Sequence, residues 1–201
     1  MDEVITRNRA AYDRIAEDFA ARNPEVPDTY LAMADEFQRR TAGPVLDLGC
    51  GPGRDLAFWT RRGTRAVGLD LSAAMLRAAR RRVAAPLVQG DLLRLPFQAG
   101  AFGGVWCSAS LLHLPKASAP AALAGIRRVL RPGAPLLLSV KEGEGETWER
   151  WPGEPADRFF AWYRAEEIEG LLGAAGLTLL RMARDVSTIG QGWLCHLAVA
   201  A

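Results

Sequence analysis

Lysine, histidine, cysteine and long apolar runs are all scarce in this sequence. Only two of the 25 basic residues are lysine and the formal net charge is +2, which gives no indication of a nucleic-acid or membrane-surface partner. The cysteines, Cys50, Cys107 and Cys195, are widely spaced in apolar surroundings, a pattern typical of reduced thiols and not of disulfides or a zinc site. No apolar run approaches the roughly 18 residues that span a bilayer, and the charged N-terminus lacks a signal-peptide core. We therefore expect a cytoplasmic protein with no metal, nucleic-acid or membrane partner.

What is present suits a single domain over residues 1–201, because 49% of the side chains are hydrophobic. Apolar side chains recur at helical spacing in residues 3–22 and 29–40, which predicts two helices before the first strand. These N-terminal helices, within residues 1–41, are a candidate lid over a site or simple packing on the sheet, and the pattern favours neither.

Strands and helices alternate over residues 43–201, which is typical of a doubly wound, mostly parallel α/β sheet covered on both faces. A Gly-rich connection at 188–192 predicts that the last two strands form an antiparallel hairpin. Residues 141–158 are expected to form a polar loop. The expected strands are 44–48, 65–70, 86–89, 103–108, 134–140, 177–185 and 193–199, with helices at 54–62, 73–83, 119–131 and 164–175.

The turn after the first strand has glycine at alternate positions, which lets the backbone approach a ligand closely. A tight strand-to-helix turn without a ligand would explain the same pattern. A dinucleotide fingerprint would place its third glycine where this chain has Arg54. Asp47, just ahead of the turn, would repel a pyrophosphate but suits an ammonium group. The turn therefore favours a cofactor without phosphates and with a cationic end. Its glycines are Gly49, Gly51 and Gly53.

Acidic residues also follow the next two strands. Asp70 is placed to accept two hydrogen bonds from a ribose diol, or else to serve the helix N-terminus beside Ser72. Asp91 is placed to accept from an exocyclic amine, with Leu92 against a purine face, although a simple loop aspartate is the alternative. Together, the order of these residues indicates a cofactor that carries adenosine.

In these motifs the sequence resembles the class I S-adenosylmethionine-dependent methyltransferases that act on small molecules. The resemblance implies a Rossmann-like sheet of seven strands with an antiparallel last strand, S-adenosylmethionine as cofactor and S-adenosylhomocysteine as product. The motifs that carry it are YDRIAEDFA (12–20), VLDLGCGPGRD (45–55), GLDLS (68–72), GDLLRLPF (90–97), FGGVWCSASLLHLP (102–115) and LRPGAPLLLSVKEG (130–143).

The resemblance also implies roles for individual residues. The glycine turn with Asp47 would hold the methionine part of the cofactor, Asp70 the ribose, and Asp91 with Leu92 the adenine. The remaining residues assigned to the cofactor are Leu71, Met75, Cys107 and Ser108.

The acceptor side is less defined. His113 follows the fourth strand and is the candidate general base, the alternative being a histidine that caps the loop. The candidate substrate residues are Tyr12, Lys141 and Glu142, and the acidic run that begins at Glu142 would favour a cationic or amine acceptor unless it is a solvated loop. His196 is expected to be structural. The absence of an Asn/Asp-Pro-Pro-aromatic motif after the fourth strand disfavours nucleobase methylation of that type.

The expected function is methyl transfer by in-line displacement to an oxygen, nitrogen or sulfur of a small molecule, by a monomer or homodimer. The alternative is a non-catalytic module that binds S-adenosylmethionine for regulation, because no catalytic acid or base is unmistakable. An aminopropyl transferase or a nicotinamide dehydrogenase is opposed by the spacing of the turn and by Asp47.

Overall fold

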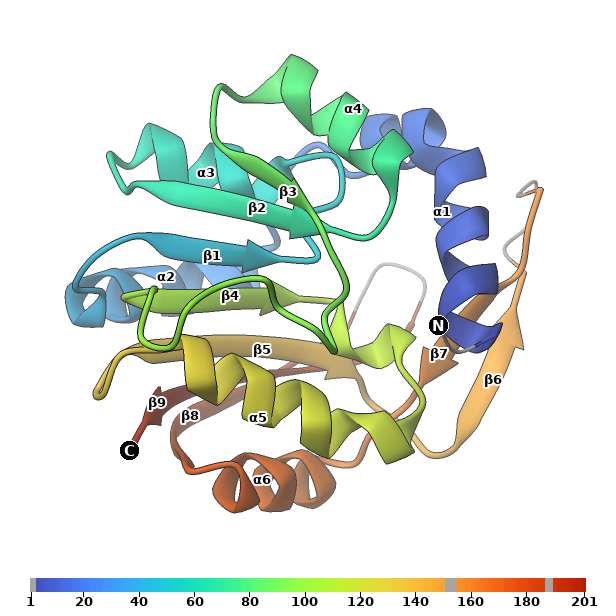
Figure 1. Ribbon diagram of the computed structural model, residues 1–201. Coiled ribbons are helices and arrows are strands. Elements are labelled where there is room, and N and C mark those ends of the chain that lie inside the picture. Colours follow the sequence, from blue (N-terminus) through green and yellow to red (C-terminus); the bar gives the residue numbers. More distant parts are fainter. Residues whose placement is uncertain (1–2, 151–154, 187–189) are drawn as a thin grey trace.

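A computed structural model describes residues 3–150, 155–186 and 190–201 (Figure 1). The helices are α1 (Glu3–Arg22), α2 (Asp28–Arg40), α3 (Arg54–Arg61), α4 (Ala73–Arg82), α5 (Ala119–Val129) and α6 (Ala165–Ala174), with short 3-10 turns η1 (Leu111–His113) and η2 (Lys116–Ser118). The strands are β1 (Val45–Leu48), β2 (Ala66–Asp70), β3 (Leu87–Gln89), β4 (Gly104–Ser108), β5 (Pro135–Lys141), β6 (Glu146–Glu149), β7 (Arg158–Ala161), β8 (Leu177–Val186) and β9 (Gly192–Ala200).

Seven of these strands form one sheet in the order β3-β2-β1-β4-β5-β9-β8. The pairs from β3 to β5 are parallel, whereas β9 runs antiparallel to both of its neighbours. This arrangement confirms the predicted fold class, including the antiparallel last strand. The strand order reverses between β1 and β4, and in such sheets ligands bind outside the carboxyl ends of the strands at that point.

Helices cover both faces of the sheet (Figure 1). On one face α2 and α3 place Phe37 and Trp59 against Trp106 of β4, with ring centroids 5.2 and 4.8 Å from that indole. On the other face, buried side chains of α5 and α6 such as Ile126 and Ile168 join the larger apolar core. Both faces of the parallel strands are thus buried under helices, and polar groups gather at the strand ends.

The prediction of a polar loop over 141–158 was wrong. β6 and β7 form an antiparallel hairpin in which Trp148 pairs with Phe159, with ring centroids 5.6 Å apart. The acidic and glycine-rich start of this segment made the short strand β6 hard to recognise, because its partner β7 begins only at Arg158. Of the expected loop, residues 151–154 lie outside the described ranges, as do residues 188 and 189 of the expected connection at 188–192.

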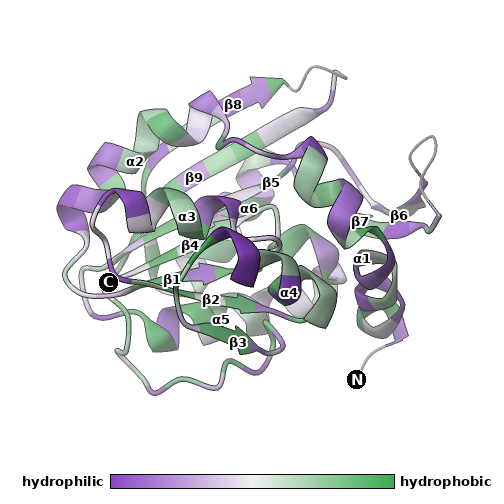
Figure 2. Cartoon of the chain, turned by 90° about the horizontal axis from the view of Figure 1, so that it is seen from above, coloured by the Kyte–Doolittle hydropathy of each residue, from purple (hydrophilic) through white to green (hydrophobic). Residues whose placement is uncertain are grey.

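The N-terminal helix α1 runs past the carboxyl ends of the parallel strands, between α4 and the β6–β7 hairpin (Figures 1 and 2). Asp13 accepts a hydrogen bond of 2.6 Å from the hydroxyl of Ser72 at the start of α4. At the other side, the side-chain carbonyl of Asn8 accepts from the backbone N–H of Phe159 at 3.1 Å. The middle of α1 is therefore tied to α4 on one side and to the β6–β7 hairpin on the other, across the edge of the sheet where a ligand would bind. None of the described helices has the length and apolar character needed to cross a bilayer.

Candidate functional site

A cavity of about 600 Å³ opens at the carboxyl ends of the parallel strands, beneath α1. This volume lies within the roughly 300 to 1,000 Å³ of typical small-molecule sites. Eleven of the residues singled out from the sequence line it: Tyr12, Gly49, Gly51, Asp70, Leu71, Met75, Asp91, Leu92, Ser108, His113 and Lys141. Four others, Asp47, Gly53, Cys107 and Glu142, do not belong to its wall.

The three glycines of the turn after β1 all have positive φ, at 77°, 51° and 80°, but they serve different ends. A side chain at Gly49 would meet the hydroxyl of Ser110 at 2.1 Å, and one at Gly53 would press on Ala79 of α4 at 3.1 Å. At Gly51 a Cβ atom would meet no atom within 4 Å and would extend into the cavity. Gly51 is therefore the position at which the absence of a side chain leaves room for a ligand.

Asp70 at the end of β2 is held in place by two backbone donors. Its Oδ2 accepts from the N–H of Gly51 and its Oδ1 from the N–H of Ser72, both at 2.8 Å. A carboxylate has about four acceptor positions, so each oxygen retains one for a ligand. Burial raises the pKa of Asp70 to about 6, against the pull of these backbone hydrogen bonds.

The segments after β2 and β3 complete this half of the wall. Oδ1 of Asp91 accepts from the N–H of Leu93 at 2.9 Å, which fixes the carboxylate beside Leu92. Met75 is buried in the first turn of α4, where its N–H donates to the capping hydroxyl of Ser72 at 3.1 Å. Together they offer one oriented acceptor and two apolar side chains, as the binding of a purine requires.

The predicted residues outside the wall have structural positions. Asp47 is only 2% exposed, and its Oδ2 has no hydrogen-bond partner among the described residues. Burial, with the nearby charge of Asp55, raises the pKa of Asp47 well above its usual range. Cys107 is fully buried in the core, and Glu142 accepts instead from the guanidinium of Arg184 at 2.9 Å.

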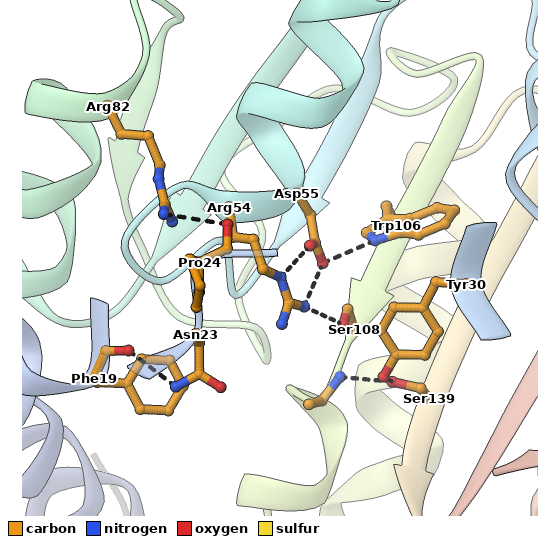
Figure 3. Close-up of polar contacts among 11 residues, drawn as sticks. Phe19, Asn23, Pro24, Tyr30, Arg54, Asp55, Arg82, Trp106, Ser108 and Ser139 are labelled. Carbon is orange, nitrogen blue, oxygen red and sulfur yellow. Dashed lines mark hydrogen bonds and ion pairs between the residues drawn. The ribbon is translucent and has the colours of Figure 1, made fainter. Parts of the chain in front are cut away.

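Sequence reasoning missed a polar network that joins the glycine turn to β4 (Figure 3). Arg54, the first residue of α3, donates from Nε and from one terminal nitrogen to Asp55 at 2.6 and 3.0 Å, and reaches the hydroxyl of Ser108 at 3.3 Å. Asp55 also accepts from the indole N–H of Trp106 at 3.0 Å. Arg54 and Asp55 are adjacent in the chain, so the sequence predicts only a charged first turn of a helix. The contact between Arg54 and Ser108 depends on the fold.

A second missed network fixes the backbone just after β4. The hydroxyls of Tyr30 and Ser139 lie 2.6 Å apart, and Ser139 accepts from the N–H of Ala109 at 2.9 Å (Figure 3). Ala109 has a φ of 51° and is the one non-glycine residue with positive φ in the described ranges. Such a conformation costs energy for a residue with a side chain and persists where its surroundings impose it.

His113 has hydrogen bonds at both ring nitrogens. Its Nδ1 lies 2.8 Å from the carbonyl oxygen of Phe159, which can only accept, so Nδ1 carries the proton. Burial, together with the positive charges of Arg158 and Lys141, lowers the pKa of His113 to about 3, so the ring is neutral. Its Nε2 therefore accepts the hydrogen bond of 2.7 Å from the hydroxyl of Tyr12. The Nε2 lone pair is thus occupied by Tyr12, and His113 orients that tyrosine in the cavity wall.

Two cations lie on the same side of the cavity as His113. Lys141 and Arg158 line the wall and are each only 2% exposed. The ammonium of Lys141 is 3.6 Å from the ring centre of Phe160 and 2.7 Å from Oε2 of Glu149. The guanidinium of Arg158 lies 5.4 Å from the same ring. Lys141 was predicted from its position at the end of the fifth strand, whereas Arg158 falls in the hairpin that was predicted to be a loop.

Comparison with known proteins places this geometry in context. Residues 45–133 match the family described as "Methyltransferase domain". The chain is 30% identical to a malonyl-[acyl-carrier protein] O-methyltransferase of Enterobacter lignolyticus, over 85% of this chain and 70% of the relative. It is 32% identical to an uncharacterized protein of a Streptomyces fradiae transposon, over 86% of this chain and 50% of the relative. The chain thus spans between half and 70% of the length of these relatives.

A solved structure shares the fold. It is the 1,6-didemethyltoxoflavin-N1-methyltransferase of Burkholderia thailandensis, with bound 1,6-didemethyltoxoflavin and S-adenosylhomocysteine. The TM-score is 0.73 at 23% identity, over 96% of this chain and 87% of that chain. At this identity the match supports the fold of the whole described sheet.

Proposed function

This chain belongs to the class I S-adenosylmethionine-dependent methyltransferases, and we propose that it transfers the methyl group of S-adenosylmethionine to an oxygen of a small-molecule acceptor. The observation that carries this proposal is the pairing of Gly51 with Asp70 in the cavity wall. Gly51 leaves open space where any side chain would intrude, and its N–H fixes the carboxylate of Asp70 at 2.8 Å.

The residues present fit this cofactor. Asp70 retains acceptor positions suited to a ribose diol, and Asp91 with Leu92 and Met75 suits an adenine. The turn at Gly49 and Gly51 lines the part of the cavity left for the methionine portion, without a phosphate-binding pattern. We propose these residues as the cofactor site.

When bound, S-adenosylmethionine supplies a methyl group on a positively charged sulfur, an electrophile that needs no further activation. The task of the protein is then to align the acceptor and to exclude water. Tyr30 and Ser139 hold the strained backbone at Ala109, where the wall passes from the cofactor residues to the acceptor side. Helix α1 closes the cavity from above through Tyr12 and its neighbours, which supports a role for the N-terminal helices as a lid.

Oxygen as the acceptor atom is supported by the similarity to the malonyl-[acyl-carrier protein] O-methyltransferase, which is named for that chemistry. The test is a turnover screen with S-adenosylmethionine over acids, alcohols, phenols, amines and thiols, with S-adenosylhomocysteine as the readout. Product formation with an oxygen acceptor is the expected result. Cofactor binding by calorimetry without turnover on any class would favour the regulatory module instead.

A further inference from the structure

The two residues that follow β4, Ala109 and Ser110, lie where the glycine turn meets the acceptor side of the cavity, and both line its wall. Ser110 fills the space beside Gly49, since a Cβ at Gly49 would come within 2.1 Å of its hydroxyl. The carbonyl of Ser110 also accepts from the backbone N–H of His113 at 3.0 Å. A shift of this short segment would therefore disturb both halves of the cavity together.

The backbone of this segment is strained at Ala109, whose φ is 51°. In that left-handed conformation the Cβ of an alanine crowds the following carbonyl oxygen, an arrangement that glycine avoids. Such a residue keeps its conformation only where its surroundings impose it. The contacts that impose it on Ala109 are therefore part of the construction of the cavity wall.

A pair of buried hydroxyls supplies these contacts. Ser108, the last residue of β4, is in register with Ser139 of β5, and the hydroxyl of Ser139 then accepts from the N–H of Ala109 at 2.9 Å. The hydroxyl of Tyr30 on α2 lies 2.6 Å from that of Ser139 (Figure 3). Both side chains are buried, so removal of either hydroxyl leaves the other without a partner it can replace with water.

These two residues are suited to hold the backbone and not to move a proton. Burial raises the pKa of Tyr30 to about 12, so its phenol stays protonated at neutral pH. Ser139 does not line the cavity and reaches it only through Ala109. Because an in-line displacement depends on alignment, a misplacement of about 1 Å can lower its rate about 100-fold.

We propose that Tyr30 and Ser139 are positioning residues for methyl transfer. By holding Ala109 at positive φ, they set Ser110 against the glycine turn and His113 in the acceptor side, and so keep the acceptor in line with the methyl group. This inference rests on the proposed methyltransferase function and adds to it two residues that form no bond in the reaction. Through Tyr30, the helix α2 contributes to the alignment from outside the sheet.

The first experiment compares kinetics and cofactor binding, with the acceptor that turns over fastest in the screen described above. Ser139→Ala should lower kcat at least about tenfold, while the calorimetric affinity for S-adenosylhomocysteine stays within about twofold of the wild type. Tyr30→Phe should behave in the same way and provides a second variant if Ser139→Ala fails to fold.

The matched control is Tyr163→Phe. Tyr163 is also fully buried, its hydroxyl has no hydrogen-bond partner among the described residues, and it does not line the cavity. This variant should keep the kcat of the wild type. Wild-type kcat in the Ser139 and Tyr30 variants, or an equal loss in Tyr163→Phe, would overturn the proposal.

The second experiment tests whether the two hydroxyls act through the strained backbone. Glycine adopts positive φ without the steric cost that alanine bears, so it needs less support from Ser139. Adding Ala109→Gly to Ser139→Ala should therefore raise kcat at least about threefold above that of Ser139→Ala alone. A double variant that is as slow as Ser139→Ala, or slower, would overturn the role assigned to Ala109.

Failure of this inference can be told from failure of the proposed function. Methyl transfer by the wild type, undiminished in Ser139→Ala and Tyr30→Phe, would leave the methyltransferase function standing and refute the positioning role. Intact S-adenosylmethionine binding with no transfer to any acceptor class would remove both.

Discussion

The hydroxyl of Tyr12 on α1 donates a hydrogen bond of 2.7 Å to Nε2 of His113, which follows β4, so the N-terminal helix is joined directly to the acceptor side of the cavity. The ring planes of the two residues are nearly perpendicular, with centroids 5.0 Å apart. This contact makes the position of α1 and the orientation of His113 a single feature of the site.

Because the two side chains act through one hydrogen bond, their substitutions should not be additive. Tyr12→Phe and His113→Ala are each expected to lower kcat about tenfold, and the double variant should fall little further. Affinity for S-adenosylmethionine should stay within about twofold of the wild type. Independent, multiplicative losses in the double variant would show that His113 acts without Tyr12, as a general base would.

The effect of Gly51 on cofactor binding can be separated from the general cost in stability of placing a side chain at positive φ. Gly51→Ala and Gly63→Ala both place a Cβ in open space at positive φ, and each should cost about 1 kcal/mol of unfolding free energy. Only Gly51 lines the cavity. Gly51→Ala should therefore weaken S-adenosylmethionine binding at least tenfold in calorimetry, with Gly63→Ala unchanged. Equal affinities in the two variants would contradict the assignment of the turn.

Because of Asp70, the affinity for the cofactor should fall as the pH falls. Its pKa is raised to about 6, so the carboxylate becomes protonated and loses acceptor capacity as pH falls through that value. Affinity for S-adenosylmethionine should be constant from pH 8 to 7 and should decline below about pH 6 in the wild type. In Asp70→Asn the affinity should be lower and nearly independent of pH. A decline of the same shape in the variant would assign the titration to another group.

His196 is predicted to make the fold sensitive to acid. It is fully buried in β9, neither ring nitrogen has a hydrogen-bond partner among the described residues, and burial lowers its pKa to about 4. Because the unfolded chain binds a proton near pH 6.5 and the folded chain does not, this contribution to stability is lost as pH falls from 6.5 toward 4. His196→Leu should reduce the loss of unfolding free energy between pH 7 and 5 by about 2 kcal/mol in urea titrations. A wild-type-like pH dependence in that variant would exclude His196 as the source.

The site residues that could be predicted from the sequence are those marked by short patterns next to a strand end. Gly51, Asp70 and Asp91 stand at successive strand ends, and the parallel topology alone brings these ends to one edge of the sheet. The missed contacts depend on residues far apart in the chain. Tyr30 meets Ser139 across 109 positions, and Asn8 meets the hairpin at Phe159 across 151 positions. No local pattern in α1 or α2 encodes these partners.

The acceptor side was harder to predict from the sequence for a related reason. The sequence of a charged loop does not tell which way its side chains face, and Glu142 and Glu144 pair with arginines that do not line the cavity. Arg158 stood in a segment without a recognisable strand, although Arg158 to Ala161 pairs with Glu146 to Glu149. The position of Arg158 in the cavity wall beside Phe160 therefore depends on the hairpin and is not encoded in a local pattern.

We propose that S-adenosylmethionine binds in the cavity beneath α1 with its ribose at Asp70. A crystal structure of the protein with S-adenosylhomocysteine tests it most directly. The ribose hydroxyls should lie within hydrogen-bond distance of the Asp70 carboxylate, with the backbone of Gly51 against the ligand and the sulfur facing the side lined by His113 and Arg158. A ligand bound elsewhere, or in this cavity with its ribose away from Asp70, would refute this binding mode.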